Sequence, residues 1–212
     1  MKKKIIYLFI LLLSSLFTIN AQNNNQAEQI ISSVLLSAKN NAIRSNFTLI
    51  ISDKSNPSGQ TTTGVFTLKG NKFVLEMDAM KAWFDGKTQW SYIPQNNEVS
   101  ITEPTEKEIS ETNPMAILSG YKNKCSIRFS MIKSLQNYVI DMIPTVKGSD
   151  ILKIEVQVNK TTENLFSIKL TDKKGSTSLL TLSNFQKNIK VSDSFFVFNS
   201  SKHKGVTEND LR

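Results

Sequence analysis

From Gly64 to Ile101 the sequence is a series of short alternating segments, and this pattern limits the possible fold more than any other feature of the chain. Apolar side chains take every second position, first at Phe66 and Leu68 and later at Val99 and Ile101. Turn residues separate the segments, and alternation with a period of two is typical of strands. The pattern predicts neighbouring antiparallel strands with one broad apolar face, which must close on itself, pack on helices or hold an apolar ligand.

The residues between these segments are suited to tight reversals of the chain. Gly70–Asn71 and Asp85–Gly86 tolerate the positive φ that short hairpins need, and Pro94–Asn97 supplies a longer turn. Further alternating segments follow towards the C-terminus. We expect about eleven strands, at 47–51, 66–68, 73–77, 90–92, 99–101, Cys125–Phe129, Tyr138–Ile143, Ile151–Val158, Leu165–Leu170, Ser178–Phe185 and Phe195–Phe198.

Three segments have helical signals. From Ala27 to Lys39 the apolar residues recur at helical spacing, which predicts an amphipathic helix that either plugs the end of the sheet or covers its apolar face. Thr105 and Glu108 have the spacing of a capping box and open a short acidic helix. Asn113 before Pro114 is a second helix start. We therefore expect about three helices.

The first 21 residues have the features of a secretory signal peptide. Three lysines at positions 2–4 precede an apolar run, and a polar stretch ends at Ala21. Ser14 and Ser15 interrupt the apolar run, which is shorter than the roughly 20 residues that a membrane-spanning helix needs. We predict a signal peptide at 1–21 and one soluble domain at 22–212, without stable membrane insertion.

Composition favours neither nucleic-acid binding nor catalysis. Removal of residues 1–21 leaves 23 basic against 18 acidic residues, a net charge of +5, and the lysines are scattered along the chain. Cys125 alternates with apolar neighbours and is expected to be a buried strand thiol. His203, the one histidine, lies in a polar segment and is expected at the surface. We predict no enzyme activity, no metal site and no cofactor.

Four segments carry a resemblance to a known family. They are Gly64–Lys69 followed by Lys72 and Phe73; Asp85-Gly86-Lys87-Thr88-Gln89-Trp90-Ser91-Tyr92; Asn113–Leu118; and Phe196-Val197-Phe198 with Gly205, Val206, Thr207, Asn209 and Asp210. In this order they resemble the periplasmic outer-membrane lipoprotein carrier family, LolA-like, over most of residues 22–212. The second segment is the most specific of the four.

The resemblance implies a mostly β (α+β) fold: a single antiparallel, strongly curved incomplete β-barrel with helices covering its concave face. It implies a periplasmic chaperone that shields the acyl chains of lipoproteins between the inner and the outer membrane. Its partners would be acylated lipoproteins as cargo, an inner-membrane ABC-type lipoprotein-releasing complex and an outer-membrane acceptor, and the carrier would be a monomer. Burial of acyl methylenes in an apolar cavity makes such transport through water possible.

The resemblance also assigns candidate residues, each of which could equally be ordinary core. The candidates for lining an apolar cavity are Phe47, Phe66, Phe73, Trp90, Phe129 and Leu182. Ile117 and Leu118 are candidate lid contacts. Lys69 stands where the family has an arginine that locks the lid, but a lysine lacks the planar fork of a guanidinium. Lys69 is therefore either a third lid contact or a solvated strand end.

Two other classes of function fit the same fold. One is a periplasmic module that binds lipid or glycolipid, or that senses envelope stress. Such a regulator would often carry an additional domain, and because Arg212 follows soon after the last predicted strand, we expect a free-standing carrier instead. The other is a structural or adhesive envelope protein whose concavity is filled by side chains. Fold alone does not choose among them.

Overall fold

The structure is a computed structural model that describes residues 24–106, 108–109 and 113–212. The predicted signal peptide at 1–21 lies outside the described residues. Among the residues that the structure describes, we find no helix with the length and apolar character that crossing a bilayer requires.

In the described part of the chain twelve strands form one sheet, two α-helices accompany it, and Glu106, Glu108 and Ile109 are also helical. The described part of the N-terminal helix covers residues 24–40, and the second helix is α3 (Pro114–Lys122). Two short 3-10 helices, η1 (Asp193–Phe196) and η2 (Ser200–Lys202), follow the long strands. The strands are β1 (Ala42–Ser52), β2 (Gln60–Lys69), β3 (Lys72–Glu76), β4 (Lys81–Phe84), β5 (Gln89–Ile93), β6 (Glu98–Thr102), β7 (Cys125–Phe129), β8 (Asn137–Pro144), β9 (Ile151–Asn159), β10 (Leu165–Asp172), β11 (Thr177–Lys187) and β12 (Thr207–Asp210).

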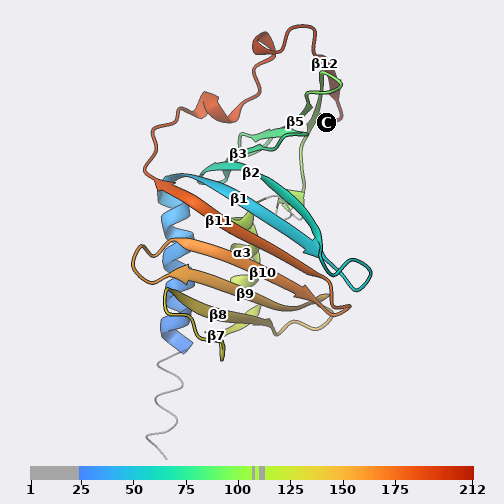
Figure 1. The fold of residues 1–212 in the computed structure, drawn as a ribbon. Coiled ribbons are helices and arrows are strands. Elements are labelled where there is room, and N and C mark those ends of the chain that lie inside the picture. The colour runs from blue at the N-terminus through green and yellow to red at the C-terminus, as the bar shows by residue number, and fades with distance from the viewer. Residues whose placement is uncertain (1–23, 107, 110–112) are drawn as a thin grey trace, which may run out of the picture.

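The sheet is open rather than closed into a barrel. Its strand order is β12-β6-β5-β4-β3-β2-β1-β11-β10-β9-β8-β7, so β12 and β7 form the two edges. All neighbours are antiparallel except β12, which pairs with β6 in parallel. The pairing of β1 with β11 joins the N-terminal meander to the C-terminal strands (Figure 1). A mostly β architecture built on a single large sheet is thereby confirmed.

Three segments differ from the predicted strands: two lie near the C-terminus and the third is β4. The predicted strand Phe195–Phe198 was wrong, because these residues belong to η1 and the extended segment after it. Thr207–Asp210 forms an unpredicted edge strand, which polar residues with no alternation do not reveal. Lys81–Phe84 was not counted as a strand because apolar residues occupy both of its faces.

The turns and caps follow the predicted chemistry. Gly70 and Gly86 have positive φ values of 62° and 105° in the hairpins β2–β3 and β4–β5. The capping box is present: the Thr105 N–H donates to the Glu108 carboxylate at 2.8 Å, and the Glu108 N–H donates to the Thr105 hydroxyl oxygen at 3.4 Å. The predicted helix from Thr105 lies partly outside the described residues.

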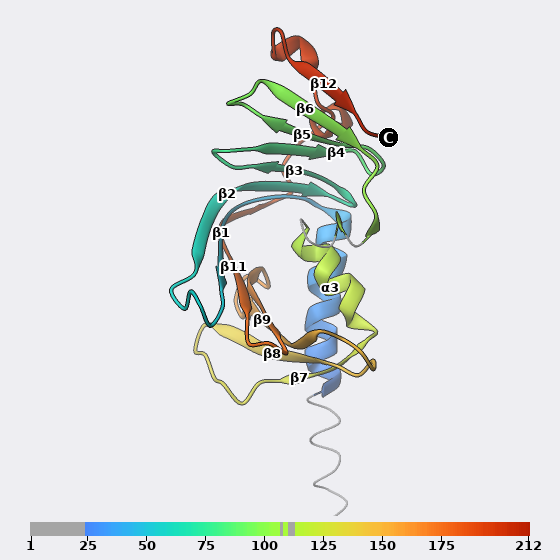
Figure 2. The ribbon, with the colours of Figure 1, turned by 90° about the vertical axis from the view of Figure 1, so that its right-hand side faces the viewer.

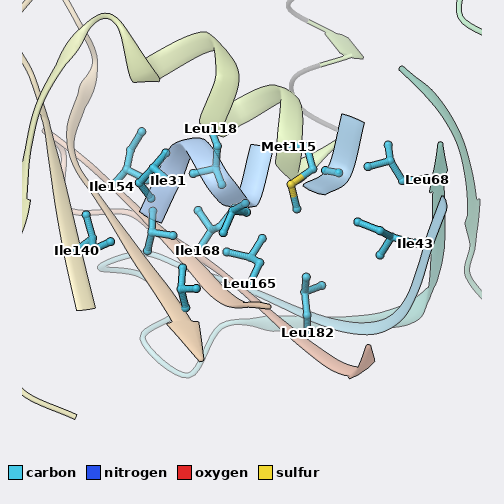
Figure 3. Packing of buried hydrophobic residues seen from close by; sticks show 14 of the residues in the cluster. Ile31, Ile43, Leu68, Met115, Leu118, Ile140, Ile154, Leu165, Ile168 and Leu182 are labelled. Carbon is cyan, nitrogen blue, oxygen red and sulfur yellow. The ribbon is translucent and has the colours of Figure 1, made fainter. Parts of the chain in front are cut away.

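Both helices lie on the same face of the sheet, which we call the inner face (Figure 2). The amphipathic pattern of the N-terminal helix is confirmed, since Ala27, Ile31, Val34 and Ala38 are buried in the main core. The helix α3 adds Met115 and Leu118 to the same core. Figure 3 shows Ile31, Met115 and Leu118 of the helices close to apolar residues of the strands.

The apolar side of the sheet changes at β4. Phe84 opposes Phe73 on the inner face, with ring centroids 5.3 Å apart, whereas its neighbour Trp83 points to the outer face and opposes Trp90. On β5 and β6 the inner positions are polar except for Ile93, which is 40% exposed at the end of β5. The apolar residues Trp90, Tyr92, Val99 and Ile101 share the outer face with Trp83. The sheet therefore has its apolar inner face only from β7 to β4.

The C-terminal segment from Ile189 to Val206 covers part of the outer face near β3 to β6 (Figure 1). Phe198 packs with Tyr92 and Val99 in a second, smaller core. His203 stacks on the Phe198 ring at 4.7 Å and lies 4.4 Å from the Tyr92 ring, measured between centroids. The expectation of a surface histidine was therefore wrong: His203 is half-buried among aromatic rings.

Candidate functional site

A continuous apolar row crosses six strands on the inner face. Antiparallel partners that lie directly opposite each other point to the same face, and successive pairings connect one residue of each strand. We call this set the inner row: Leu49, Leu180, Ile168, Val156, Ile140 and Phe129, on β1, β11, β10, β9, β8 and β7. With about 4.8 Å between strands, the row is roughly 24 Å long.

The middle of the inner row is covered and its ends are not. Ile168, Val156 and Ile140 are at most 1% exposed beneath the helices, whereas Leu49, Leu180 and Phe129 are only half-buried. The apolar inner face therefore extends beyond the part that the helices cover.

A margin of exposed apolar surface lies at one end of the strands. Ile51 follows Leu49 on the same face of β1 and is 52% exposed, and Leu170 on β10 is half-buried. The N-terminal helix crosses the opposite ends of these strands (Figure 1). An apolar ligand could contact this margin without the removal of any core side chain.

The helix α3 covers the inner face through few side chains. Pro114, Met115 and Leu118 are its buried residues, and its nine residues give only about two and a half turns. The start of α3 is fixed by Asn113, whose side-chain oxygen accepts a hydrogen bond of 2.9 Å from the Met115 N–H. Of the predicted lid contacts, Leu118 is fully buried in the main core and Ile117 is half-buried.

The structure brings five of the six predicted lining residues to the main core. Phe47 opposes Leu182, Phe66 and Phe73 are almost fully buried, and Phe129 packs at the β7 edge. These side chains are contiguous because the alternating positions of paired strands point to one face. They form the tightly packed floor of the inner face.

Gly64 is required beside Phe47. The two residues are paired across β1 and β2, and the Phe47 ring lies over the glycine. A Cβ atom at position 64 would clash with the main-chain oxygen of Glu76 and would stand 2.7 Å from Phe47 Cε1, closer than real side chains approach. The glycine of the Gly-Val-Phe segment therefore makes room for an aromatic ring on the inner face.

The sixth predicted lining residue, Trp90, lies elsewhere. It points to the outer face and packs against the second core of Tyr92, Val99 and Phe198. The four-residue connection from Asp85 to Thr88 sets this register, with the Asp85 carboxylate accepting bonds from the Lys87 and Thr88 N–H groups at 2.9 and 2.8 Å. Trp90 is thus separated from the inner row by the sheet itself.

Lys69 also points to the outer face. Its ammonium donates to Asp193 Oδ1 at 2.9 Å, and the Lys72 ammonium lies 3.0 Å from Asp193 Oδ2. Hydrogen bonds from these two lysines lower the pKa of the Asp193 carboxyl. Lys69 therefore connects the C-terminal segment to the sheet, on the face opposite to α3.

Cys125 lies on the inner side of the edge strand β7, where it packs against the main core. Burial raises the pKa of its thiol, which disfavours the reactive thiolate. In the described part of the chain, no three His, Cys, Asp or Glu side chains form a group that could hold a metal ion. The arrangement is suited to binding apolar groups by contact and by exclusion of water.

Sequence reasoning missed the half-buried residues at the β1 end of the inner row. Leu49 and Leu180 share a strand parity with Phe47 and Leu182, which were predicted to lie inside, so the signal was present. It was not decisive because residues at the same parity are covered or uncovered according to where the helices lie.

These features define the structural class of the protein. It is a mostly β protein with an open, mostly antiparallel sheet, and helices pack on the apolar face of that sheet. Residues 16–176 match the family model described as outer membrane lipoprotein carrier protein LolA. Because the match spans most of the sequence, the chain belongs to this family.

Similarity to individual proteins also extends over most of the chain. The chain is 27% identical over 148 residues to an outer-membrane lipoprotein carrier protein of Shewanella pealeana, and the alignment covers 68% of each chain. An uncharacterized conserved protein from Thermus thermophilus has the same fold, with a TM-score of 0.56, 10% identity and coverage of 86% of this chain and 98% of the other. A LolA superfamily protein from Nitrosomonas europaea matches with a TM-score of 0.43 and 12% identity over 81% of this chain and 97% of the other.

Proposed function

We propose that the protein is a periplasmic carrier that shields the acyl chains of lipoproteins on the inner face of its sheet. In this proposal residues 22–212 form one domain, exported by the signal peptide 1–21, and the sheet is a strongly curved incomplete barrel. The carrier works as a monomer, receives cargo from an inner-membrane ABC-type releasing complex and delivers it to an outer-membrane acceptor. It carries out no chemical reaction and needs no cofactor.

The observation that carries the proposal is the uncovered margin of the inner face. Leu49 and Leu180 form the uncovered end of the apolar inner row and Ile51 lies beside them, so an acyl chain could begin to bind there. Each methylene transferred from water to such a surface gains about 0.8 kcal/mol. A lipid chain thus supplies enough free energy to stay bound during passage through water.

Full burial of the acyl chains requires α3 to move away from the sheet. Its contact depends on Met115 and Leu118, whereas the N-terminal helix buries four apolar residues. We infer that α3 is the part that moves, and that contact of the sheet with the acyl chains offsets the lost burial of Pro114, Met115 and Leu118. Ile117, half-buried beside Leu118, would then contact the cargo as well.

Native mass spectrometry of the exported protein, isolated from the periplasm of its own host, tests the cargo. Diacylated or triacylated lipoprotein bound at a one-to-one ratio is the expected result. Recovery of free lipid or glycolipid alone would contradict the carrier proposal and favour a lipid-binding or sensing module. The carrier proposal would also be contradicted if the protein bound no lipoprotein after incubation with purified lipoprotein.

Adjacent leucines of β11 provide a matched pair of variants. Leu180 packs on the inner face and Leu179 points to the outer face, and both are half-buried. Leu180→Asp should weaken the binding of a triacylated lipopeptide at least about tenfold, because a charge would meet the acyl chains. Leu179→Asp should leave the binding unchanged, and equal losses in the two variants would contradict an inner-face site.

A further inference from the structure

The loop between β7 and β8 exposes three large apolar side chains within five residues. Met131 is 92% exposed, Ile132 57% and Leu135 97%, and all three belong to residues 131–135. We call these five residues the apolar loop. Large apolar side chains that gather on a surface in this way mark a site of contact with a partner or a membrane.

Hydrogen bonds hold the apolar loop in this outward form. The Ile132 N–H donates to the Ser130 hydroxyl oxygen at 3.3 Å, and the Asn137 N–H donates to the Ser134 hydroxyl oxygen at 3.1 Å. Lys160, in the adjacent β9–β10 turn, donates through its ammonium to the carbonyl oxygens of Ser134 and Leu135 at 2.7 and 3.3 Å. The main chain is thus satisfied by polar contacts while the apolar side chains project into solvent.

The charge around the apolar loop is mostly positive. Lys133 lies within the loop, Lys160 supports it, and Arg128 is exposed on the preceding strand. The acidic groups nearby are Glu163, in the turn that contains Lys160, and Asp141, which is paired with Arg128 across β7 and β8. Apolar side chains with basic neighbours match the interfacial layer of a membrane that contains anionic phospholipids.

We propose that the apolar loop inserts reversibly into the surface of a bilayer that contains anionic phospholipid. Met131, Ile132 and Leu135 would enter the boundary between headgroups and acyl chains, while Lys133 and Lys160 would contact the headgroups. Contact through three side chains is weak and reversible, in contrast to the insertion of a spanning helix. The inference depends on the loop alone and does not require that the protein carries lipoproteins.

Vesicle sedimentation with the cargo-free exported protein tests this contact. The probes are vesicles of phosphatidylethanolamine and phosphatidylglycerol at three to one, and vesicles of phosphatidylcholine. We expect binding to the anionic vesicles that falls about tenfold in Met131→Ser/Leu135→Ser, because two apolar side chains would no longer enter the bilayer. Lys133→Glu should weaken binding to the anionic vesicles only.

A control double variant uses other exposed apolar residues, outside the apolar loop. Leu152 and Leu211 are 54% and 68% exposed, and Leu152 lies at the other end of β9 from the apolar loop. The double variant Leu152→Ser/Leu211→Ser should bind anionic vesicles as the wild type does. All these positions are exposed, so unchanged thermal melting should confirm that each variant folds.

A fluorescent variant reports the insertion directly. The emission of Leu135→Trp should shift to shorter wavelength with anionic vesicles and be quenched by brominated lipid. Absence of wild-type binding to the anionic vesicles would overturn the proposal, as would equal binding by Met131→Ser/Leu135→Ser. Binding only to native membranes, lost when their proteins are digested, would overturn it in favour of a protein partner.

Discussion

The two halves of the sheet bury opposite faces. From β7 to β3 the inner face is apolar and lies against two helices, while the outer face carries charges, such as the Lys153 ammonium at 3.3 Å from carboxylate oxygens of Asp141 and Glu155. On β5 and β6 the outer face is apolar and lies against the C-terminal segment. The strand β4, with Trp83 outside and Phe84 inside, is where the two arrangements meet.

This difference indicates separate roles for the two halves. The first half contains the uncovered apolar margin and the helix α3, which are the two features that the proposed binding of acyl chains uses. The second half has a small core of its own, and its inner positions are mostly polar, so it does not continue the apolar inner row. The proposed carrier function would therefore place the cargo on the half between β7 and β4.

The largest expected effect is on the main core. Ile154 is fully buried in the first half, and Ile154→Ala should lower the free energy of unfolding by about 2–5 kcal/mol through lost contacts and a cavity. Urea denaturation followed by circular dichroism measures this change. A loss of less than about 1 kcal/mol would contradict the tight packing of this half.

A smaller and local effect is expected in the second core. Phe198 holds the C-terminal segment against Tyr92 and Trp83, so Phe198→Ala should detach that segment. Hydrogen exchange should accelerate in residues 190–210 and remain unchanged in β8 and β9. Equal acceleration throughout the sheet would show that the two cores unfold as one and would remove the distinction between the halves.

The smallest expected effect concerns the ion pairs of Asp193. Hydrogen bonds from Lys69 and Lys72 lower the pKa of the Asp193 carboxyl in the folded protein. The pairing therefore stabilises the folded state at pH values above the ordinary pKa of 3.8, and this stabilisation is lost as the pH falls through the lowered pKa. NMR titration of the carboxyl should show a midpoint below 3.8, and Lys69→Gln should raise it. Because the groups are exposed, the melting temperature should barely change. An unchanged midpoint in Lys69→Gln would contradict the pairing.

The sequence was sufficient to predict the first half of the sheet. Strands such as Ile151–Asn159 alternate regularly because one face is buried and the other is solvated, and this alternation is visible in the residues themselves. The amphipathic N-terminal helix and the turns at Gly70 and Gly86 were predicted for similar local reasons.

The second half was not predictable in the same way. The pattern at Trp90 and Tyr92 shows that one face of β5 is apolar, but not that this face is the outer one, because the side depends on the register set between Asp85 and Thr88. The role of Lys69 depends on Asp193, which is 124 residues away in the chain. Such long-range contacts leave no local signal.

The most direct test of cargo binding by the inner face is site-specific photocrosslinking at adjacent positions of β11. The photoreactive residue p-benzoylphenylalanine is placed at Leu180 on the inner face or at Leu179 on the outer face, and the protein is loaded with acylated lipoprotein. We predict crosslinks to the acyl chains from position 180 and none from position 179. Crosslinks of equal yield from both positions, or from position 179 alone, would contradict the assignment of cargo to the inner face.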